Sequence, residues 1–136
     1  MRSASIEVKV AFADLDGMRI VYHTNYIKWF DLARTKLFRE AGLPIDRWED
    51  GGIYLPVVSC SCEYLESASF GDDLRVTARV ENAEGAVLDL KYEIEKLDAG
   101  RIITTGSTRH IFCGQDMKSM KLDQTFPDLY RDLILE

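Results

Sequence analysis

The chain has 136 residues, of which 46% are apolar and 29% are charged, and its 17 Lys and Arg against 23 Asp and Glu leave a formal net charge of −6. This length suits a single domain, residues 1–136, with enough apolar side chains for a core. The negative charge and the absence of a basic run argue against nucleic-acid binding. No stretch approaches the roughly 20 apolar residues of a membrane span, and no export signal follows Met1, so we expect a cytoplasmic protein.

The first third of the chain predicts a strand, a turn and a long helix. Residues 5–13 alternate apolar and polar, which indicates a strand, and residues 14–17 (DLDG) are typical of a turn. Over residues 25–41 apolar side chains recur at helical spacing. Gly42 suits a left-handed C-cap, and Pro44 prevents the helix from continuing.

After residue 53 the pattern changes to a period of two, which predicts half-buried strands over residues 58–64, 74–80, 88–94 and 102–113. The short connections at residues 70–73, 81–86 and 98–101 predict that successive strands are antiparallel neighbours. Residues 127–135 predict one or two helical turns, with Leu129, Leu133 and Ile134 facing inward.

These elements favour one architecture. The apolar stripe of a single long helix can be covered only by the face of such a sheet, so we expect an α+β fold in which a central helix is wrapped by a five- to six-stranded antiparallel sheet. The weak alternation over residues 102–113 suggests that part of the outer surface is also covered, most simply by another copy of the chain.

The cysteines and histidines give little sign of a metal site. Cys60 and Cys62 are separated by one residue, which is poor geometry for a disulfide, and we interpret both as small core residues on one strand face. All three cysteines, Cys113 included, are expected to be free thiols. Because His23 and His110 fall on separate elements, we expect no metal site.

The most informative stretch is residues 14–26. Asp16 lies in the loop before the helix, whose first amides, near His23 and Thr24, lack intrahelical partners and carry the positive end of the helix dipole. A carboxylate near such amides suits attack on a carbonyl, because the amides can stabilise the developing oxyanion. The same residues could instead make only turn bonds and an ordinary helix start.

Residues 12–43 resemble the signature of the 4-hydroxybenzoyl-CoA thioesterase family, the hot-dog-fold acyl-CoA thioesterases that include Tol-Pal-associated enzymes. They read FADLDGMRIVYHTNYIKWFDLARTKLFREAGL. The family pattern of D-x-D, V-Y-H-x-N-Y, an acidic residue before x-A-R and a final G-L matches at Asp14, Asp16, Val21, Tyr22, His23, Asn25, Tyr26, Asp31, Ala33, Arg34, Gly42 and Leu43. Residues 56–60 and 70–72 resemble the strand and the turn that follow in that family.

The resemblance implies a homodimeric or homotetrameric enzyme that hydrolyses an acyl thioester of coenzyme A or of an acyl carrier protein. Coenzyme A or phosphopantetheine would enter only as part of the substrate. Asp16 would be the nucleophile or general base, and the backbone amide of His23 would polarise the carbonyl. The resemblance also places four residues at the substrate pocket: Tyr22, Asn25, Val58 and Ser59.

Two departures from the family pattern stand out. Arg19 occupies a place where family members usually have glycine. It could keep the Asp16 carboxyl ionised, bind a carboxylate or phosphate of the substrate, or point to solvent. The hairpin at residues 81–86 carries two acids and no base, whereas some members bind the phosphates of coenzyme A there.

Two other functions remain open from the sequence. A hot-dog hydratase or dehydratase would need the imidazole of His23 together with a carboxylate. A non-catalytic acyl-binding or assembly domain would keep the fold without the reaction.

Overall fold

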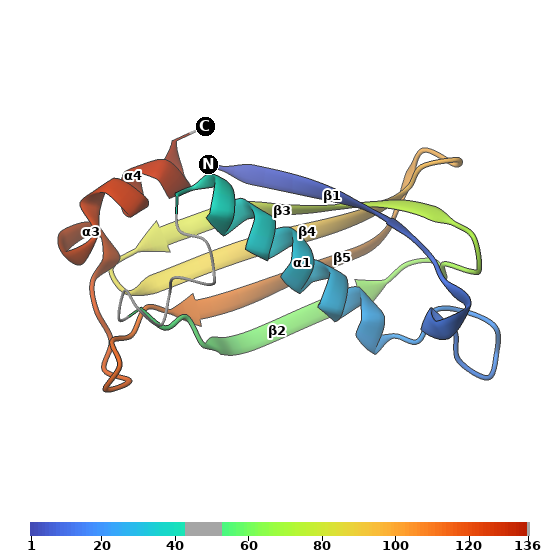
Figure 1. Cartoon of the computed structure of the whole chain (residues 1–136), viewed down its shortest axis with the longest axis horizontal. Helices are drawn as coiled ribbons and strands as arrows, with labels where there is room; N and C mark the ends of the chain where they lie inside the picture. Colours follow the sequence, from blue (N-terminus) through green and yellow to red (C-terminus); the bar gives the residue numbers. More distant parts are fainter. Residues whose placement is uncertain (43–52, 136) are drawn as a thin grey trace.

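The computed structural model describes residues 1–42 and 53–135, in which a long helix lies across one face of a five-stranded antiparallel sheet (Figure 1). The sheet order is β1-β3-β4-β5-β2. The strands are β1 (Ser3–Lys9), β2 (Val57–Tyr64), β3 (Asp73–Glu84), β4 (Val87–Lys96) and β5 (Arg101–Ile111), and the helix is α1 (Thr24–Glu40). The α+β fold expected from the sequence is therefore confirmed, with five strands.

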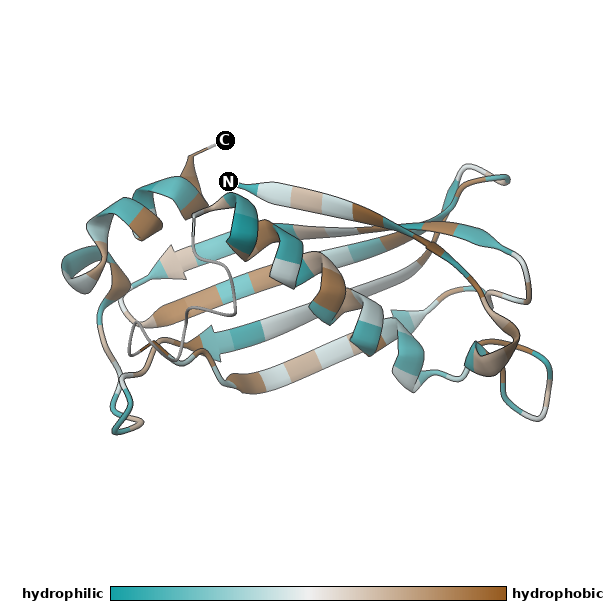
Figure 2. Ribbon diagram, in the orientation of Figure 1, coloured by the Kyte–Doolittle hydropathy of each residue, from teal (hydrophilic) through white to brown (hydrophobic). Residues whose placement is uncertain are grey.

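The core lies between α1 and the inner face of the sheet. Polar and apolar residues alternate along the strands, and the apolar face of each central strand packs under the helix (Figure 2). Phe30 of α1 stacks on Tyr92 of β4, with 4.5 Å between the ring centroids. The helix matches the predicted range to within one residue, and Gly42 has the predicted left-handed backbone, with a φ of +88°. Leu43 and Pro44 lie outside the described residues.

The first strand is shorter than predicted. Residues 12–14 form a 3-10 turn (η1, Phe12–Asp14) rather than the end of a strand, and the Phe12 side chain is 79% exposed. The carboxylate of Asp14 accepts a hydrogen bond from the amide of Ala11 at 2.8 Å, and the Asp14 amide donates to the Ala11 carbonyl. These local bonds replace the strand ladder, because a short acidic side chain competes for backbone donors.

The prediction that the second and third strands are neighbours is wrong. β2 pairs with β5 and forms the edge of the sheet opposite β1, whereas β3 lies between β1 and β4. The connection is not the short turn at 70–73 but the whole segment 65–72. Eight extended residues reach about 26 Å, enough to cross the roughly 14 Å between strands three places apart. This segment passes under the start of α1, where the Val21 amide donates to the Ala68 carbonyl.

As an edge strand, β2 is exposed almost throughout, which corrects the expectation that it is half buried. Cys60 is exposed and Cys62 is only partly buried, so they are not core residues, whereas Cys113 is buried. All three cysteines are free thiols. The alternation over residues 58–64 predicts a strand, and a strand is present. Alternation alone does not predict burial, because burial depends on which other elements pack against each face of the strand.

Two short helices close the end of the sheet near the chain termini (Figure 1). α3 (Leu122–Thr125) was not predicted, whereas α4 (Pro127–Ile134) has the expected position and buries Leu133 completely. The Arg2 amide donates to the Leu133 carbonyl, which joins the two termini. None of the helices in the described ranges is long and apolar enough to cross a membrane. The cytoplasmic location stays a prediction.

Candidate active site

The DLDG segment and the residues after it form a tight hairpin that leads directly into α1. Leu15 and Val21 face each other in a β-bridge, the Asp16 amide donates to the Ile20 carbonyl at 2.8 Å, and the Tyr22 amide donates to the Asp14 carbonyl at 2.9 Å. A turn is thus present here but is shifted from the predicted residues 14–17 to residues 16–19, where the Arg19 amide donates to the Asp16 carbonyl at 3.1 Å. These bonds fix the backbone of Asp16 and leave its side chain available for other contacts.

Asp16 is half-buried and lines a cleft of about 690 Å³. One carboxylate oxygen, Oδ1, accepts a hydrogen bond from the Met18 amide at 2.7 Å. Within residues 1–42 and 53–135, the other oxygen, Oδ2, has no hydrogen-bond or ion-pair partner. The Met18 amide therefore fixes Oδ1, while Oδ2 is available to a ligand. The cleft is lined by Phe12, Leu15, Asp16, Arg19, Ser69 and Phe70.

Arg19 lines the same cleft and has an unusual backbone. Its φ of +65° lies in the left-handed region, which glycine enters freely and most other residues avoid. This geometry explains why glycine is the usual residue at this place in the family that the sequence resembles. The Arg19 guanidinium makes no ion pair with Asp16 or with any other acid in the described part of the chain.

The start of α1 supplies the expected main-chain donors. His23 precedes the helix with helical backbone angles, and the first amide of this segment to donate a hydrogen bond is that of Asn25, which donates to the Tyr22 carbonyl. The amides of His23 and Thr24 have no partner among the described residues. His23 itself is exposed and does not line the Asp16 cleft; the hairpin places it on the strand that returns from that cleft.

The other predicted pocket residues fall at two separate places. Tyr22 is exposed beside His23, with 4.8 Å between the rings, and the Asn25 side chain donates to the Asp14 carbonyl at 2.9 Å. Asn25 therefore stabilises the hairpin. Val58 and Ser59 lie at the start of β2, whereas the end of β2 is next to His23, so within one chain they do not reach the cleft.

Sequence reasoning missed several residues that build this end of the molecule. The Tyr64 hydroxyl donates to the His23 carbonyl at 3.1 Å, and its ring lies 5.2 Å from that of Tyr26. Burial raises the pKa of both tyrosines, so both hydroxyls stay protonated. Phe12 and Phe70 meet edge to face at 6.3 Å across the cleft. The only signal for Tyr64 was its place on the inner face of a strand.

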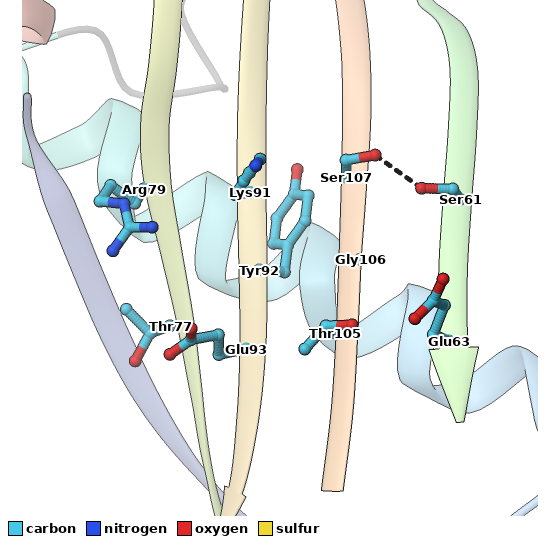
Figure 3. Close-up of a pocket in the computed structure, with 10 residues that line it drawn as sticks. All are labelled: Ser61, Glu63, Thr77, Arg79, Lys91, Tyr92, Glu93, Thr105, Gly106 and Ser107. Atoms are coloured by element: carbon cyan, nitrogen blue, oxygen red, sulfur yellow. Dashed lines mark hydrogen bonds between the residues drawn. The ribbon is translucent and has the colours of Figure 1, made fainter. Parts of the chain in front are cut away.

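A second, more polar depression of about 390 Å³ lies on the outer face of the sheet (Figure 3). Two bases, Arg79 and Lys91, lie in one row across the strands, and two acids, Glu63 and Glu93, lie in the next. These charges balance one another. The described residues that line this depression all belong to strands, so it has no free helix-start amides for a carbonyl, and the Asp16 cleft is the better candidate site.

The chain's second histidine belongs to a buried hydrogen-bond chain that the sequence did not predict. Arg34 donates to the Tyr92 hydroxyl at 2.9 Å, Tyr92 bonds Thr108 at 2.7 Å, and Thr108 bonds Nε2 of His110 at 2.8 Å. Nδ1 of His110 lies 3.3 Å from the Leu55 carbonyl. Burial, with the positive charge of Arg34, lowers the pKa of His110 to about 4. In residues 1–42 and 53–135, no three His, Cys, Asp or Glu side chains could hold a metal ion.

Comparisons with known proteins show the family and the fold of this chain. The family model of the Thioesterase-like superfamily matches residues 10–128. A solved structure of a DHNA-CoA thioesterase from Staphylococcus aureus is 32% identical, covers 97% of this chain and 89% of its own, and superposes with a TM-score of 0.88. The chain is 35% identical to 4-hydroxybenzoyl-CoA thioesterase of Pseudomonas sp. strain CBS-3 over 78 residues, 55% of each protein. It is 25% identical to acyl-CoA thioesterase YbgC of Haemophilus influenzae over 118 residues, 86% of this chain and 84% of that one.

Proposed function

Because the chain belongs to the Thioesterase-like superfamily and has its hot-dog fold, we propose that it hydrolyses an acyl thioester of coenzyme A or of an acyl carrier protein to a free acid and a thiol. The observation that carries this proposal is the geometry of Asp16. Its carboxylate has one oxygen held by the Met18 amide and one open toward the cleft, in a hairpin that runs into the unpartnered first amides of α1. In this proposal Asp16 is the nucleophile or general base, and the amides that follow the hairpin are the oxyanion donors.

In the reaction we propose, the open oxygen of Asp16 acts on the thioester carbon. It either attacks directly, expelling the thiolate and forming a mixed anhydride that water cleaves, or it takes a proton from the water that attacks. The carbonyl oxygen gains negative charge in either route. The His23 amide, at the positive end of the helix, stabilises that charge. No metal or organic cofactor is needed.

The two aspartates of the hairpin provide a matched test of this role. Asp16→Asn keeps an oxygen that accepts the Met18 amide, so the turn is retained while the negative charge is lost. We expect kcat for an acyl-CoA to fall by at least about 100-fold. Asp14→Asn likewise keeps an acceptor for the Ala11 amide but lies outside the cleft, and should retain most activity. Near-normal turnover by Asp16→Asn would refute the assignment.

The role of the His23 amide can be tested separately from its imidazole. The φ of His23 is −57°, which proline adopts without strain, so His23→Pro removes the amide hydrogen from a backbone that already has the required angle. We expect His23→Pro to lower kcat by about 10²- to 10³-fold, the usual cost of one oxyanion donor. His23→Ala keeps the amide and should keep most activity. A large loss in His23→Ala would favour the dehydratase type of mechanism instead.

We further propose that the active form is a homodimer or a homotetramer in which β2 pairs with β2 of a second copy. β2 is an edge strand with unpaired backbone groups, and its Val58 side chain is 54% exposed. Exposed edges of this kind are templates for pairing with another chain. An antiparallel two-fold pairing brings the start of one β2 beside the end of the other. The partner copy would then bring Val58 and Ser59 close to Tyr64 and His23, as pocket residues.

This arrangement predicts that oligomerisation and activity are lost together. Val58→Lys places a charge on the proposed interface, and we expect it to shift the mass measured by analytical ultracentrifugation to the monomer and to lower kcat. Leu135→Lys is a matched control, because Leu135 is also an exposed apolar residue but lies at the C-terminus. A fully active monomeric Val58→Lys protein would exclude a contribution of the second copy to the site.

A further inference from the structure

Arg19 is the one basic side chain among the six residues that line the Asp16 cleft. The other charged residue there is Asp16 itself. Nearby acids are already engaged, since Asp14 accepts the Ala11 amide and Asp72 accepts the amide of Ser69 and pairs with Lys96. Arg19 makes no ion pair with these acids or with Asp16 in the described residues, although Asp16 lines the same cleft. The charge of Arg19 is available to a ligand in the cleft.

The hairpin needs a left-handed backbone at position 19, and the backbone there is strained because the residue is arginine rather than glycine. A residue other than glycine with a φ of +65° is destabilised relative to glycine at the same place. The Arg19 side chain gains no compensating burial, because it is exposed, and it makes no ion pair in the described residues. Such a strained residue at the rim of a reactive cleft indicates that its side chain is used in function.

The position of Arg19 limits which part of a substrate it can contact. It lies three residues from Asp16 and lines the same cleft, so a group bound by its side chain would share that cleft with the thioester carbon that Asp16 would act on. In coenzyme A and in a carrier protein, the whole pantetheine arm separates the thioester sulfur from the nearest phosphate. A phosphate therefore lies far from the reacting carbon, and an anionic group that meets Arg19 must belong to the acyl part.

We infer that the preferred substrate is a thioester whose acyl group carries a second carboxylate, and that Arg19 binds this carboxylate and determines specificity. The inference rests on the proposed hydrolase function. An anionic acyl group would be repelled by the Asp16 carboxylate unless a cation lay between them or beside them, and a guanidinium binds a carboxylate through two parallel hydrogen bonds. The rings of Phe12 and Phe70 would cover the apolar part of the acyl chain.

The experiment compares two thioesters of the same chain length, adipoyl-CoA and hexanoyl-CoA, which differ by the terminal carboxylate. kcat/KM is measured for each with wild type and with Arg19→Gln, Arg19→Lys and Arg39→Gln. Arg39 is exposed in the last turn of α1, so its variant removes the same charge outside the cleft. We expect wild type to prefer adipoyl-CoA and Arg19→Gln to lose roughly tenfold or more of kcat/KM for that substrate alone. Arg19→Lys should retain part of the preference, and Arg39→Gln all of it.

Each other outcome overturns the inference in a distinguishable way. If Arg19→Gln lowers kcat/KM equally for both substrates, Arg19 serves the fold or the phosphates, and adipoyl-pantetheine, which has no phosphate, separates these two. If wild type prefers hexanoyl-CoA, the carboxylate is not recognised, although the hydrolase function stands. If wild type cleaves neither coenzyme A thioester nor their carrier-protein forms, the inference fails; the proposed function fails with it only if a panel of other acyl and aroyl thioesters is also left uncleaved.

Discussion

We predict that acid destabilises this protein through His110, because the folded chain holds that imidazole neutral. His110 is 1% exposed, and its pKa is lowered from 6.5 to about 4 by burial and by Arg34. Nδ1 of His110 faces the Leu55 carbonyl, which can only accept, so in the neutral imidazole Nδ1 carries the proton and Nε2 accepts from the Thr108 hydroxyl. A second proton, on Nε2, would force the Thr108 hydroxyl to turn from donor to acceptor and would place a charge beside Arg34, which donates at the other end of the same chain.

The sign and size of the effect follow from linkage. The unfolded chain takes up a proton on this histidine below about pH 6.5, whereas the folded chain does so only near pH 4. The contribution to stability is therefore complete above pH 6.5 and is lost as the pH falls toward 4. The difference between 6.5 and about 4 corresponds to about 3 kcal/mol in full, and to about 2 kcal/mol at pH 5. That is a large part of the 5–15 kcal/mol typical of a domain.

Urea unfolding at pH 7.5 and pH 5 measures this contribution, with His110→Gln as the reference variant. Gln can bond Thr108 and the Leu55 carbonyl but does not titrate, and all other ionisable groups are the same in both proteins. We expect the free energy of unfolding of wild type, relative to the variant, to fall by about 2 kcal/mol between the two pH values. If the two proteins lose stability in parallel, the histidine is not held neutral by the fold and the reasoning is wrong.

Three further substitutions have predictable effects on the urea midpoint or on Tm. Gly106→Ala should destabilise by about 1–3 kcal/mol, because its Cβ would overlap the Phe30 ring and lie 2.8 Å from the Ser61 carbonyl; unchanged stability would mean that the helix can move away from the sheet. Thr104→Val should stabilise by about 1 kcal/mol, because the buried Thr104 hydroxyl has no partner in the described residues; a loss of stability would reveal a hidden one. Arg19→Gly should raise stability by up to about 1 kcal/mol, because it relieves the left-handed backbone; a lower Tm would show that the guanidinium supports the fold.

The sequence predicted those features whose physics is local. The α1 stripe, the Gly42 cap and the turn at Asp16 each depend on residues within a few positions of one another, and the structure has all three. Two predictions were wrong for the same reason. The neighbour of β2 and the burial of Cys60 depend on strand order, and a two-residue alternation carries no information about which strand lies alongside.

The candidate site was predictable only in part for the same reason. Asp16 was predicted from its place in the loop before the helix and Arg19 from its departure from the family pattern, and the hairpin that holds both places them at one cleft. Tyr64 and Phe70 come from segments more than forty residues away, and only the crossing of residues 65–72 beneath the start of α1 brings them to this end. The buried histidine chain joins α1, β4 and β5, and no spacing in the sequence indicates it.

The two ends of the molecule differ in a way that separates stability from function. At the end near the termini, α3 and α4 cover the sheet and bury Leu122 and Leu133, so the core is closed. At the other end, the strained Arg19 and the unpartnered amides of α1 are left open, together with exposed aromatic rings such as that of Phe12. A protein selected only for stability would place glycine at position 19 and cover those rings. We therefore expect a ligand to act at the open end, while burial of Leu122 and Leu133 at the closed end contributes to the stability of the whole domain.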